Sequence, residues 1–170
     1  MFPLKNLGRN IRKAILEPGY AVRALIKRSK AYINYLFDKN GKGSLPEAIT
    51  FFLTYRCNLR CSMCGQWGDS GSNKFYSSDK ISDELSLETY IKLLDEIKLF
   101  NPHITLFGGE PLLYKDIENL IKEIKKRNLH CCIITNGVLS GKYAEAIVNN
   151  KIDEISLSID GSETLHDTIR

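Results

Sequence analysis

Hydrophobic positions recur with two different periods along the chain, and the change of period divides it into two parts. Over residues 5–37 the apolar positions are three or four residues apart, which is typical of an amphipathic helix. The dipeptide Pro18-Gly19 interrupts this segment and predicts two helices instead of one. Residues 38–46 are rich in glycine and polar residues and are predicted to form a linker. We therefore expect a basic helical extension with its linker at residues 1–47 and a separate domain at residues 48–170.

From residue 48 onward, short apolar runs alternate with amphipathic segments. The predicted strands lie at about 49–54, 103–107, 130–135 and 154–159. The predicted helices between them lie at about 87–99, 115–127 and 140–149, the first with Ser86 as its N-cap. Alternation of strands and helices at this spacing predicts parallel strands joined by crossover helices, which is an α/β fold.

The composition fits a globular protein and narrows the classes of function. Hydrophobic residues make up 43% of the chain and charged residues 26%, which argues against intrinsic disorder. No apolar run approaches the ~18 residues that cross a membrane, and none resembles a secretory signal. We therefore expect a cytoplasmic protein with reduced thiols, in which five cysteines, three of them clustered, favour metal binding over disulfides.

Positive charge is concentrated in the N-terminal segment. The net charge is +4, and residues 1–43 alone hold ten Lys or Arg against Glu17 and Asp38, a balance of +8 that leaves −4 for residues 44–170. This distribution argues against a nucleic-acid-binding protein, and we expect no nucleic-acid partner. Residues 1–37 are expected either to rest on an anionic membrane surface as a peripheral contact or to pack on the domain as a plain extension.

Three cysteines follow the first predicted strand in the pattern Cys57-x3-Cys61-x2-Cys64. Soft thiolates select zinc, copper(I) or iron–sulfur clusters, so this loop is a candidate metal centre. Arg56 and Arg60 stand beside the cysteines in the sequence. They are expected either to offset the negative charge of a thiolate-bound metal or to be plain solvent-exposed residues.

A closed zinc site would need a fourth ligand, because structural zinc usually takes four. The remaining candidates are His103, Cys131 and Cys132. The two cysteines are neighbours in a predicted strand, so at most one of them faces a given site, and both are expected to be packing residues. Three ligands without an evident fourth favour a cluster with an open metal position. A zinc-stapled interaction module without catalysis stays the alternative.

Each predicted strand ends in a polar or glycine-containing motif. The motifs are Thr54-Tyr-Arg-Cys57, Gly108-Gly-Glu-Pro111, Thr135-Asn-Gly137 and Ser158-Ile-Asp-Gly161. In parallel α/β folds the binding site gathers at the carboxyl ends of the strands, where these loops converge. Any one of the motifs is compatible with an ordinary turn, but together they predict a common site.

The cysteine motif, the Gly108–Pro111 motif and the Ser158–Gly161 motif together resemble the radical S-adenosylmethionine (SAM) superfamily over residues 48–170. The ending from Asp160 to Arg170 is similar to the branch that contains the molybdenum-cofactor cyclase and the SPASM-type enzymes. The resemblance implies a partial (βα) TIM-like barrel, of which this chain holds the first four strand–helix units, with a [4Fe–4S] cluster and SAM. It also implies reductive cleavage of SAM to a 5′-deoxyadenosyl radical that abstracts hydrogen from a small-molecule or peptide substrate, whose identity the sequence leaves open.

By this resemblance, Cys57, Cys61 and Cys64 bind three irons of the cluster, and the amino and carboxylate groups of SAM chelate the fourth. An electron donor such as flavodoxin or ferredoxin is implied as the source of the reducing electron. Met63 stands where the family usually has an aromatic residue that lines the adenine, and a thioether packs well on an aromatic ring.

The same resemblance assigns the methionine amino group of SAM to Gly108, Gly109 and Glu110. Two glycines expose backbone carbonyls, and a carboxylate pairs with an ammonium. The further implied cofactor contacts are Asn136, Ser158 and Asp160. Near the end of the chain, a local salt-bridged structural element is expected from His166, Arg170, Asp167 and Glu163.

The family's partial barrel usually has six strand–helix units. This chain is expected to supply four strands and to end before the fourth crossover helix. We therefore expect an incomplete domain with an open sheet edge, weakly active at best and prone to aggregate.

Overall fold

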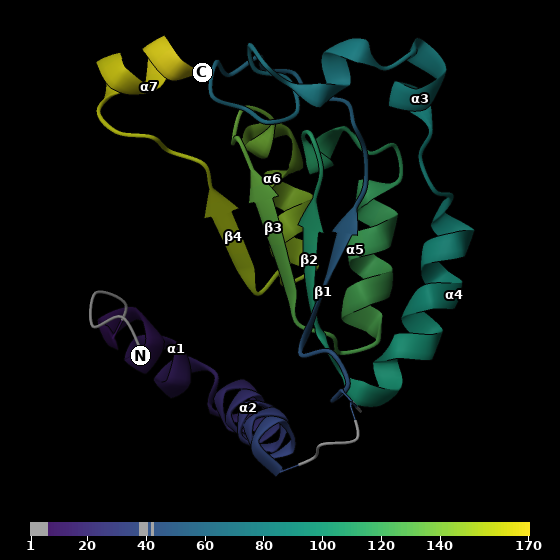
Figure 1. Cartoon of the computed structure of the whole chain (residues 1–170), viewed down its shortest axis with the longest axis vertical. Coiled ribbons are helices and arrows are strands. Elements are labelled where there is room, and N and C mark those ends of the chain that lie inside the picture. Colours follow the sequence, from purple (N-terminus) through teal and green to yellow (C-terminus); the bar gives the residue numbers. More distant parts are fainter. Residues whose placement is uncertain (1–6, 38–40, 42) are drawn as a thin grey trace. The chain divides into compact units, whose positions relative to one another are not determined.

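The computed structural model describes all residues except 1–6, 38–40 and 42. The chain forms two compact units, Met1–Glu47 and Ala48–Arg170. The described part of the first unit contains the helices α1 (Leu7–Leu16) and α2 (Pro18–Phe37) (Figure 1). Among the described residues, no helix combines the length and the apolar character that crossing a bilayer requires.

The two predicted N-terminal helices are present, but the break between them is not at Pro18-Gly19. Only Glu17 lies between the helices, and Pro18 is the first residue of α2. Proline suits this position because its missing N–H is one that the first turn leaves without a partner, and its fixed φ is already helical. The proline therefore starts the second helix instead of separating the two.

The second unit is built on a four-stranded parallel sheet with the order β1-β2-β3-β4. The strands are β1 (Ala48–Phe52), β2 (His103–Phe107), β3 (Cys131–Thr135) and β4 (Glu154–Leu157). Because sequence order equals spatial order, every connection runs from one strand to its immediate neighbour. All four carboxyl ends therefore reach the same edge of the sheet (Figure 1).

Three helices connect the strands and lie on one side of the sheet (Figure 1). They are α4 (Leu87–Ile97), α5 (Ile117–Lys126) and α6 (Ser140–Asn149). The Ser86 Oγ accepts a hydrogen bond from the Thr89 amide at 3.2 Å and caps α4, as predicted. The shorter elements are α3 (Ser78–Ser82), α7 (Glu163–Ile169) and the 3-10 turns Ser72–Phe75, Lys98–Phe100 and Pro111–Leu113.

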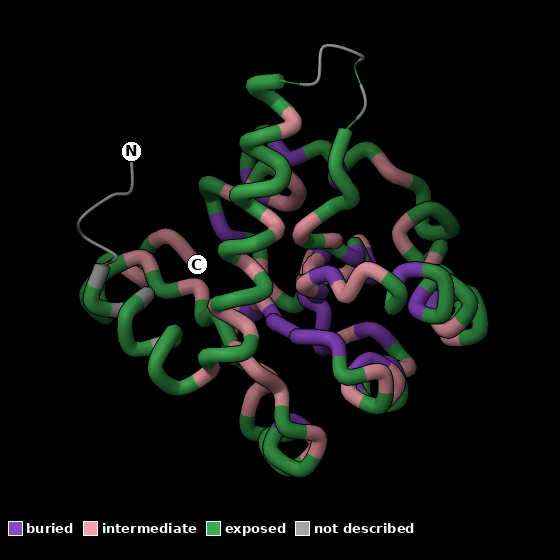
Figure 2. The backbone as a smooth tube through the Cα atoms, turned by 90° about the horizontal axis from the view of Figure 1, so that it is seen from below, coloured by how far each residue is buried: buried purple, intermediate pink, exposed green. Residues whose placement is uncertain are grey.

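The core lies between these helices and the sheet. Helix α5 presents Ile117, Leu120, Ile121 and Ile124 on one stripe, and all four are buried. From the sheet, alternate residues point to the same side and are fully buried: Ile104, Leu106, Cys131 and Ile133. Figure 2 shows the buried segments, whereas α2 contains no buried residue. The sheet and its carboxyl edge thus rest on a rigid layer of packed helices.

The opposite face of the sheet and its last strand are more open. Phe107 and Ile134 are half-buried on the face away from the helices. In β4, Ile155 and Leu157 are 42% and 52% exposed, so the sheet is not closed and its β4 edge is open, as predicted. After β4 the chain continues into α7, a helix that the hydrophobic pattern did not predict.

Candidate metal and cofactor site

The loops after the four strands enclose one cavity of about 140 Å³ at the carboxyl edge of the sheet. Its lining comes from all four strand ends and from the end of α7. The lining residues are Cys57, Cys61, Met63, Cys64, Phe107, Gly109, Ile134, Thr135, Asn136, Ser158 and Arg170. The structure therefore brings together the three cysteines and four of the seven other predicted site residues, namely Met63, Gly109, Asn136 and Ser158.

The three thiols differ in exposure and in their hydrogen-bond donors. Cys61 is buried, whereas Cys57 and Cys64 are half-buried. Backbone amides point at the sulfurs, from Leu59 to Cys57 Sγ at 3.5 Å and from Gln66 to Cys64 Sγ at 3.4 Å. Burial raises the pKa of the Cys57 thiol; the Leu59 amide opposes this rise, and Glu110 and the other two thiols add to it. Donors of this kind stabilise the thiolate form that a metal binds.

The cysteine loop is folded tightly by its own backbone. The Cys64 amide donates to the Cys61 carbonyl at 3.0 Å, and the Gly68 amide donates to the Cys64 carbonyl at 2.8 Å. A Cβ on Gly68 would lie 2.4 Å from the Ser62 carbonyl oxygen, so only glycine fits this turn. The Ser62 amide also donates to the Ile169 carbonyl at 2.9 Å, which ties the loop to α7.

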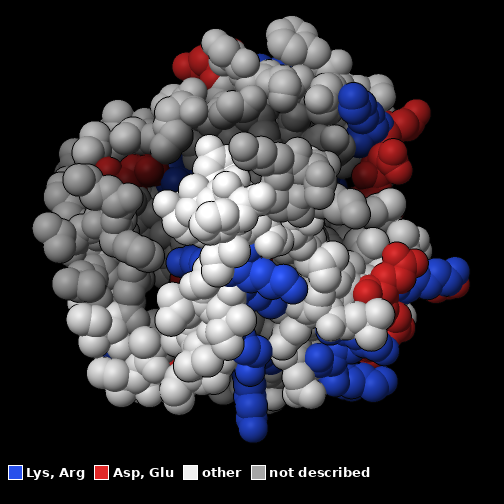
Figure 3. Space-filling model, turned by 60° about the horizontal axis from the view of Figure 1, so that its bottom comes forward, with Lys and Arg blue, Asp and Glu red and all other residues white. Residues whose placement is uncertain are grey.

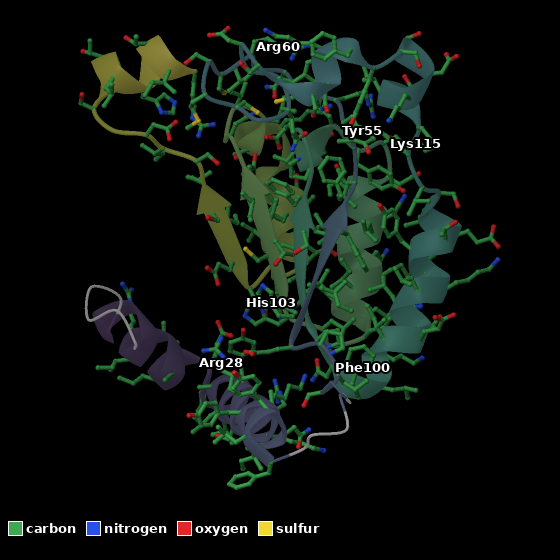
Figure 4. All side chains as sticks on the ribbon, viewed as in Figure 1. Arg28, Tyr55, Arg60, Phe100, His103 and Lys115 are labelled. Atoms are coloured by element: carbon green, nitrogen blue, oxygen red, sulfur yellow. The ribbon has the colours of Figure 1, made fainter. Side chains whose placement is uncertain are left out.

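The two arginines of this loop are used for structure. Arg56 pairs with Glu84 at 2.7 Å and donates to the Leu113 carbonyl at 2.7 Å, so its charge is directed away from the cysteines. Arg60 stacks its guanidinium 4.1 Å above the Trp67 ring and donates to the Cys57 carbonyl at 2.8 Å. Figure 4 shows Arg60 at the same edge of the sheet as Tyr55. Arg56 is half-buried, whereas Arg60 stays an exposed loop residue.

Gly108 and Gly109 permit a close approach of two loop backbones. The Gly109 amide donates to the Thr54 carbonyl at 2.8 Å and thereby extends the pairing of β1 and β2 beyond the strands. A Cβ on Gly109 would lie 2.3 Å from the Arg56 carbonyl oxygen, and Gly108 has a φ of 154°. Gly109 lines the cavity, whereas the Gly108 carbonyl accepts from Gln66 Nε2 at 3.2 Å.

Glu110 is fully buried and does not line the cavity. Its carboxylate accepts from the Leu112 amide at 3.0 Å, the Thr135 hydroxyl at 2.8 Å and the Asn136 amide at 2.9 Å. These three donors occupy both oxygens. In this structure, the carboxylate that the resemblance assigns to the SAM amino group joins the ends of β2 and β3.

Asn136 joins the third strand end to the cysteine loop. Its Nδ2 donates to Asn58 Oδ1 at 2.8 Å and lies 4.0 Å from Cys57 Sγ, while its Oδ1 accepts from the Val138 amide at 3.0 Å. The side chain is thus fixed at the cavity wall beside one of the thiols.

Ser158 and Asp160 have different positions, although both follow β4. Ser158 lines the cavity, and its amide donates to the Thr135 carbonyl at 3.0 Å. Asp160 lies outside the lining and forms an ion pair with Arg170. The Arg170 Nη1 is in turn 3.9 Å from Cys61 Sγ. Asp160 therefore reaches the site through Arg170.

Near the end of the chain, Arg170 and His166 both contact Asp160 and not the residues that were expected to pair with them. Arg170 pairs with Asp160, and the His166 ring Nδ1 accepts from the Asp160 amide at 3.4 Å. The prediction that used Asp167 and Glu163 is wrong, because α7 turns Arg170 toward the strand end.

Within the described residues, the cavity lining contains no fourth cysteine and no histidine. His103 begins β2, at the end opposite the cysteine loop, as Figure 4 shows. Cys131 and Cys132 are buried in β3 and take no part in the lining. The donor set is therefore three soft thiols facing an open space, which fits a metal centre that keeps one position for another ligand.

Three lining residues were not predicted from the sequence, namely Phe107, Ile134 and Arg170, and Thr135 was predicted only as part of its strand-end motif. Phe107 and Thr135 are the last residues of their strands, and this position at the carboxyl edge could have identified them as lining residues. Arg170 is ten residues from Asp160 in the sequence. No periodicity in the sequence indicates that the two side chains meet.

The profile of the Radical SAM superfamily matches residues 51–170, which is more than half of the chain. The chain belongs to the radical SAM superfamily. The predicted family is thereby confirmed. The superfamily is one of enzymes that use a [4Fe–4S] cluster and SAM, and the three thiols at the open cavity fit such a cluster.

Named relatives of this radical SAM chain act on different kinds of molecule. The GTP 3′,8-cyclase of Clostridium perfringens (strain SM101 / Type A) is 32% identical over 125 residues, which cover 72% of this chain and 37% of the relative. The Fe-coproporphyrin III synthase of Methanosarcina barkeri (strain Fusaro / DSM 804) is 28% identical over 159 residues, which cover 91% of this chain and 37% of the relative. The chain thus spans little more than a third of the length of these relatives.

Solved structures support the fold. Streptococcus suis SuiB bound to S-adenosylmethionine aligns over 95% of this chain and 38% of its own, with a TM-score of 0.61 and 19% identity. BtrN in complex with AdoMet and 2-DOIA aligns over 74% of this chain and 51% of its own, with a TM-score of 0.56 and 20% identity. The predicted α/β fold, part of a TIM-like barrel, is confirmed.

Proposed function

We propose that Cys57, Cys61 and Cys64 hold a [4Fe–4S] cluster in the cavity and that SAM completes its coordination. The observation that supports this most strongly is that three thiols from one loop face a single cavity whose other walls come from the remaining strand ends. When bound, the two groups supply a 5′-deoxyadenosyl radical, the species that abstracts hydrogen from a substrate.

The residues of this chain have separate tasks in that function. Gly109 and Ser158 line the cavity and offer polar groups to the amino-acid end of SAM. Met63 is 61% exposed at the lining, and its thioether offers a polarizable surface to the adenine. Asn136 and Arg170 place N–H donors near Cys57 and Cys61 and thereby support the negative charge of the thiolates.

Two further features of the function are part of the proposal. An electron donor such as flavodoxin or ferredoxin reduces the centre, and two of the three cysteines are half-buried, which leaves the centre close to the surface for that transfer. The substrate class stays open, since the proteins that the chain resembles include a GTP cyclase, an Fe-coproporphyrin III synthase and SuiB, which has also been solved bound to a precursor peptide.

The test is anaerobic reconstitution of the full chain with iron and sulfide. We expect about four irons and four sulfides per chain, as for a [4Fe–4S] centre, with a visible absorption that bleaches on reduction. Cys61→Ala should abolish it, whereas Cys132→Ala, the matched control at a buried cysteine outside the cavity, should retain it. One tightly bound zinc and no cluster in the unmodified chain would instead support the zinc-stapled module.

A further inference from the structure

The helix pair of the first unit exposes many apolar side chains. At 100° per residue, seven apolar side chains of α2 fall on one stripe about 140° wide. We call them the apolar stripe: Val22, Leu25, Ile26, Tyr32, Ile33, Leu36 and Phe37. Each is at least 48% exposed, and Phe37 is 78% exposed. A helix of a globular protein normally turns such a stripe toward a core, so this one indicates a partner.

Helix α1 also exposes apolar residues, although fewer than α2. Ile11 and Ile15, four residues apart on α1, are 51% and 72% exposed. Arg12 is exposed and lies on another face of the same helix. Two consecutive helices thus combine exposed apolar residues with basic ones.

Basic side chains border the apolar stripe. On the helical projection Arg23, Lys27 and Lys30 follow directly after one edge of the stripe. Arg23 and Lys30 are exposed, and Lys27 is half-buried. Long cationic side chains in this position reach past the apolar surface toward a negatively charged layer. Figure 3 shows Lys and Arg on the face that it draws, some among uncharged residues and some beside Asp or Glu.

Two linker residues contact α2 outside the apolar stripe, one of them within its basic border. Asn34 Nδ2 donates to Ser44 Oγ at 2.9 Å, and Arg28 pairs with Glu47 at 2.8 Å. Both helix residues lie outside the apolar stripe on the projection. These contacts of the described linker residues therefore involve polar residues of α2 and not the stripe.

We propose that helices α1 and α2 bind the surface of an anionic lipid bilayer. The apolar stripe enters the boundary between headgroups and acyl chains, and the basic side chains at its border contact anionic headgroups. Charge complementarity favours this partner: residues 1–43 carry +8, so the same segment of a second copy would bring a like charge. The binding is independent of the metal site and places the radical SAM domain beside the membrane.

The experiment uses the full chain and flotation with vesicles of phosphatidylcholine, with or without phosphatidylglycerol. We expect flotation with the anionic vesicles alone, and its loss at high salt. The apolar variant is Leu25→Ser, Ile26→Ser and Ile33→Ser, and it should also fail to float. The basic variant is Arg23→Gln, Lys27→Gln and Lys30→Gln, and its partition should fall roughly fivefold for each charge removed. A control with the same net charge, Lys92→Gln, Lys122→Gln and Lys126→Gln on the exposed faces of α4 and α5, should bind like the unmodified chain.

Several outcomes would overturn the proposal. They are an absence of flotation with either kind of vesicle, equal flotation with both kinds, or an equal loss of vesicle binding in the basic variant and its control. A dimer that the apolar variant converts to a monomer, with lipid binding unchanged, would assign the stripe to a second copy. Helix content by circular dichroism and iron loading should stay unchanged in all variants, which separates a failure to bind lipid from a failure to fold.

Discussion

The carboxylate of Glu110 accepts a hydrogen bond from the Thr135 hydroxyl at 2.8 Å, and the exposed fraction of Glu110 is 0%. The same carboxylate holds the Asn136 amide at 2.9 Å. Asn136 in turn reaches the cysteine loop through Asn58. One buried carboxylate thus sets the position of a cavity wall that it does not itself line.

Replacing Glu110 should therefore lower the stability of the folded chain. In Glu110→Gln an amide N–H₂ replaces one oxygen, so at least one buried N–H or hydroxyl loses its acceptor, and we expect a loss of about 1–3 kcal/mol in the free energy of unfolding. Glu110→Ala should lose more, because all three donors lose their partner. Urea unfolding measures both, with the exposed Glu118→Gln on α5 as control. An unchanged urea midpoint in Glu110→Gln would contradict the structural role.

Gly109→Ala should destabilise the pairing of the first two loops. The added methyl group would lie 2.3 Å from the Arg56 carbonyl oxygen, and backbone atoms cannot move aside cheaply. We expect a loss of about 1–3 kcal/mol in unfolding free energy. Gly141→Ala is the matched control, because nothing lies within 4 Å of its added Cβ in α6, and it should be neutral or stabilising by up to about 1 kcal/mol. Equal urea midpoints for the two variants would count against the close approach.

The sequence predicts the strands, the connecting helices and the edge of the sheet where the site lies, because all three follow from the local pattern of apolar and polar residues. The apolar periods identify the strands and the connecting helices, and the Ser86 cap is found where expected. Strand ends are less predictable. The apolar run after β1 continues through Leu53 and Thr54, which are buried under the loops although the strand ends at Phe52.

Contacts between distant residues are the part that the sequence does not predict. Glu110 meets Thr135 because the register of β2 and β3 brings their ends together. Arg56 meets Glu84 across a long loop, so its charge does not serve the cysteines. Residue types and spacing identify a candidate site, but hydrogen-bond partners depend on register and loop conformation.

Arg170 should tune the proposed cluster through its position near Cys61. Its guanidinium pairs with Asp160 and lies 3.9 Å from the Cys61 sulfur. Positive charge and N–H donation at a ligand sulfur favour the reduced, more negative centre, so Arg170→Gln should shift the midpoint potential to a more negative value. Asp160→Asn releases the guanidinium but also removes a nearby negative charge, and because these two effects oppose each other its shift should be smaller. The measurement is a redox titration of the reconstituted chain followed by electron paramagnetic resonance. Lys92→Gln is the control, and an identical potential in Arg170→Gln would exclude the effect.

The loss of folding stability at low pH should depend on Arg127, which connects α4 and α5. Arg127 pairs with Asp95 at 3.0 Å and also with Glu123. Hydrogen bonds from Arg127, and then from Lys98, lower the pKa of Asp95 below its ordinary 3.8, and the Arg127 hydrogen bond lowers the pKa of Glu123 below its ordinary 4.5.

A carboxylate with a lowered pKa in the folded state stabilises the fold above its ordinary pKa, and this contribution is lost as the pH falls through the folded value. The urea midpoint of the unmodified chain should therefore begin to fall below about pH 5 and keep falling as the pH passes through the lowered pKa values of the folded state, and it should fall less in Arg127→Gln. Because Asp95 is largely exposed, added salt should reduce the difference between the two proteins. Parallel pH profiles for the two proteins would show that these pairs contribute nothing to acid unfolding.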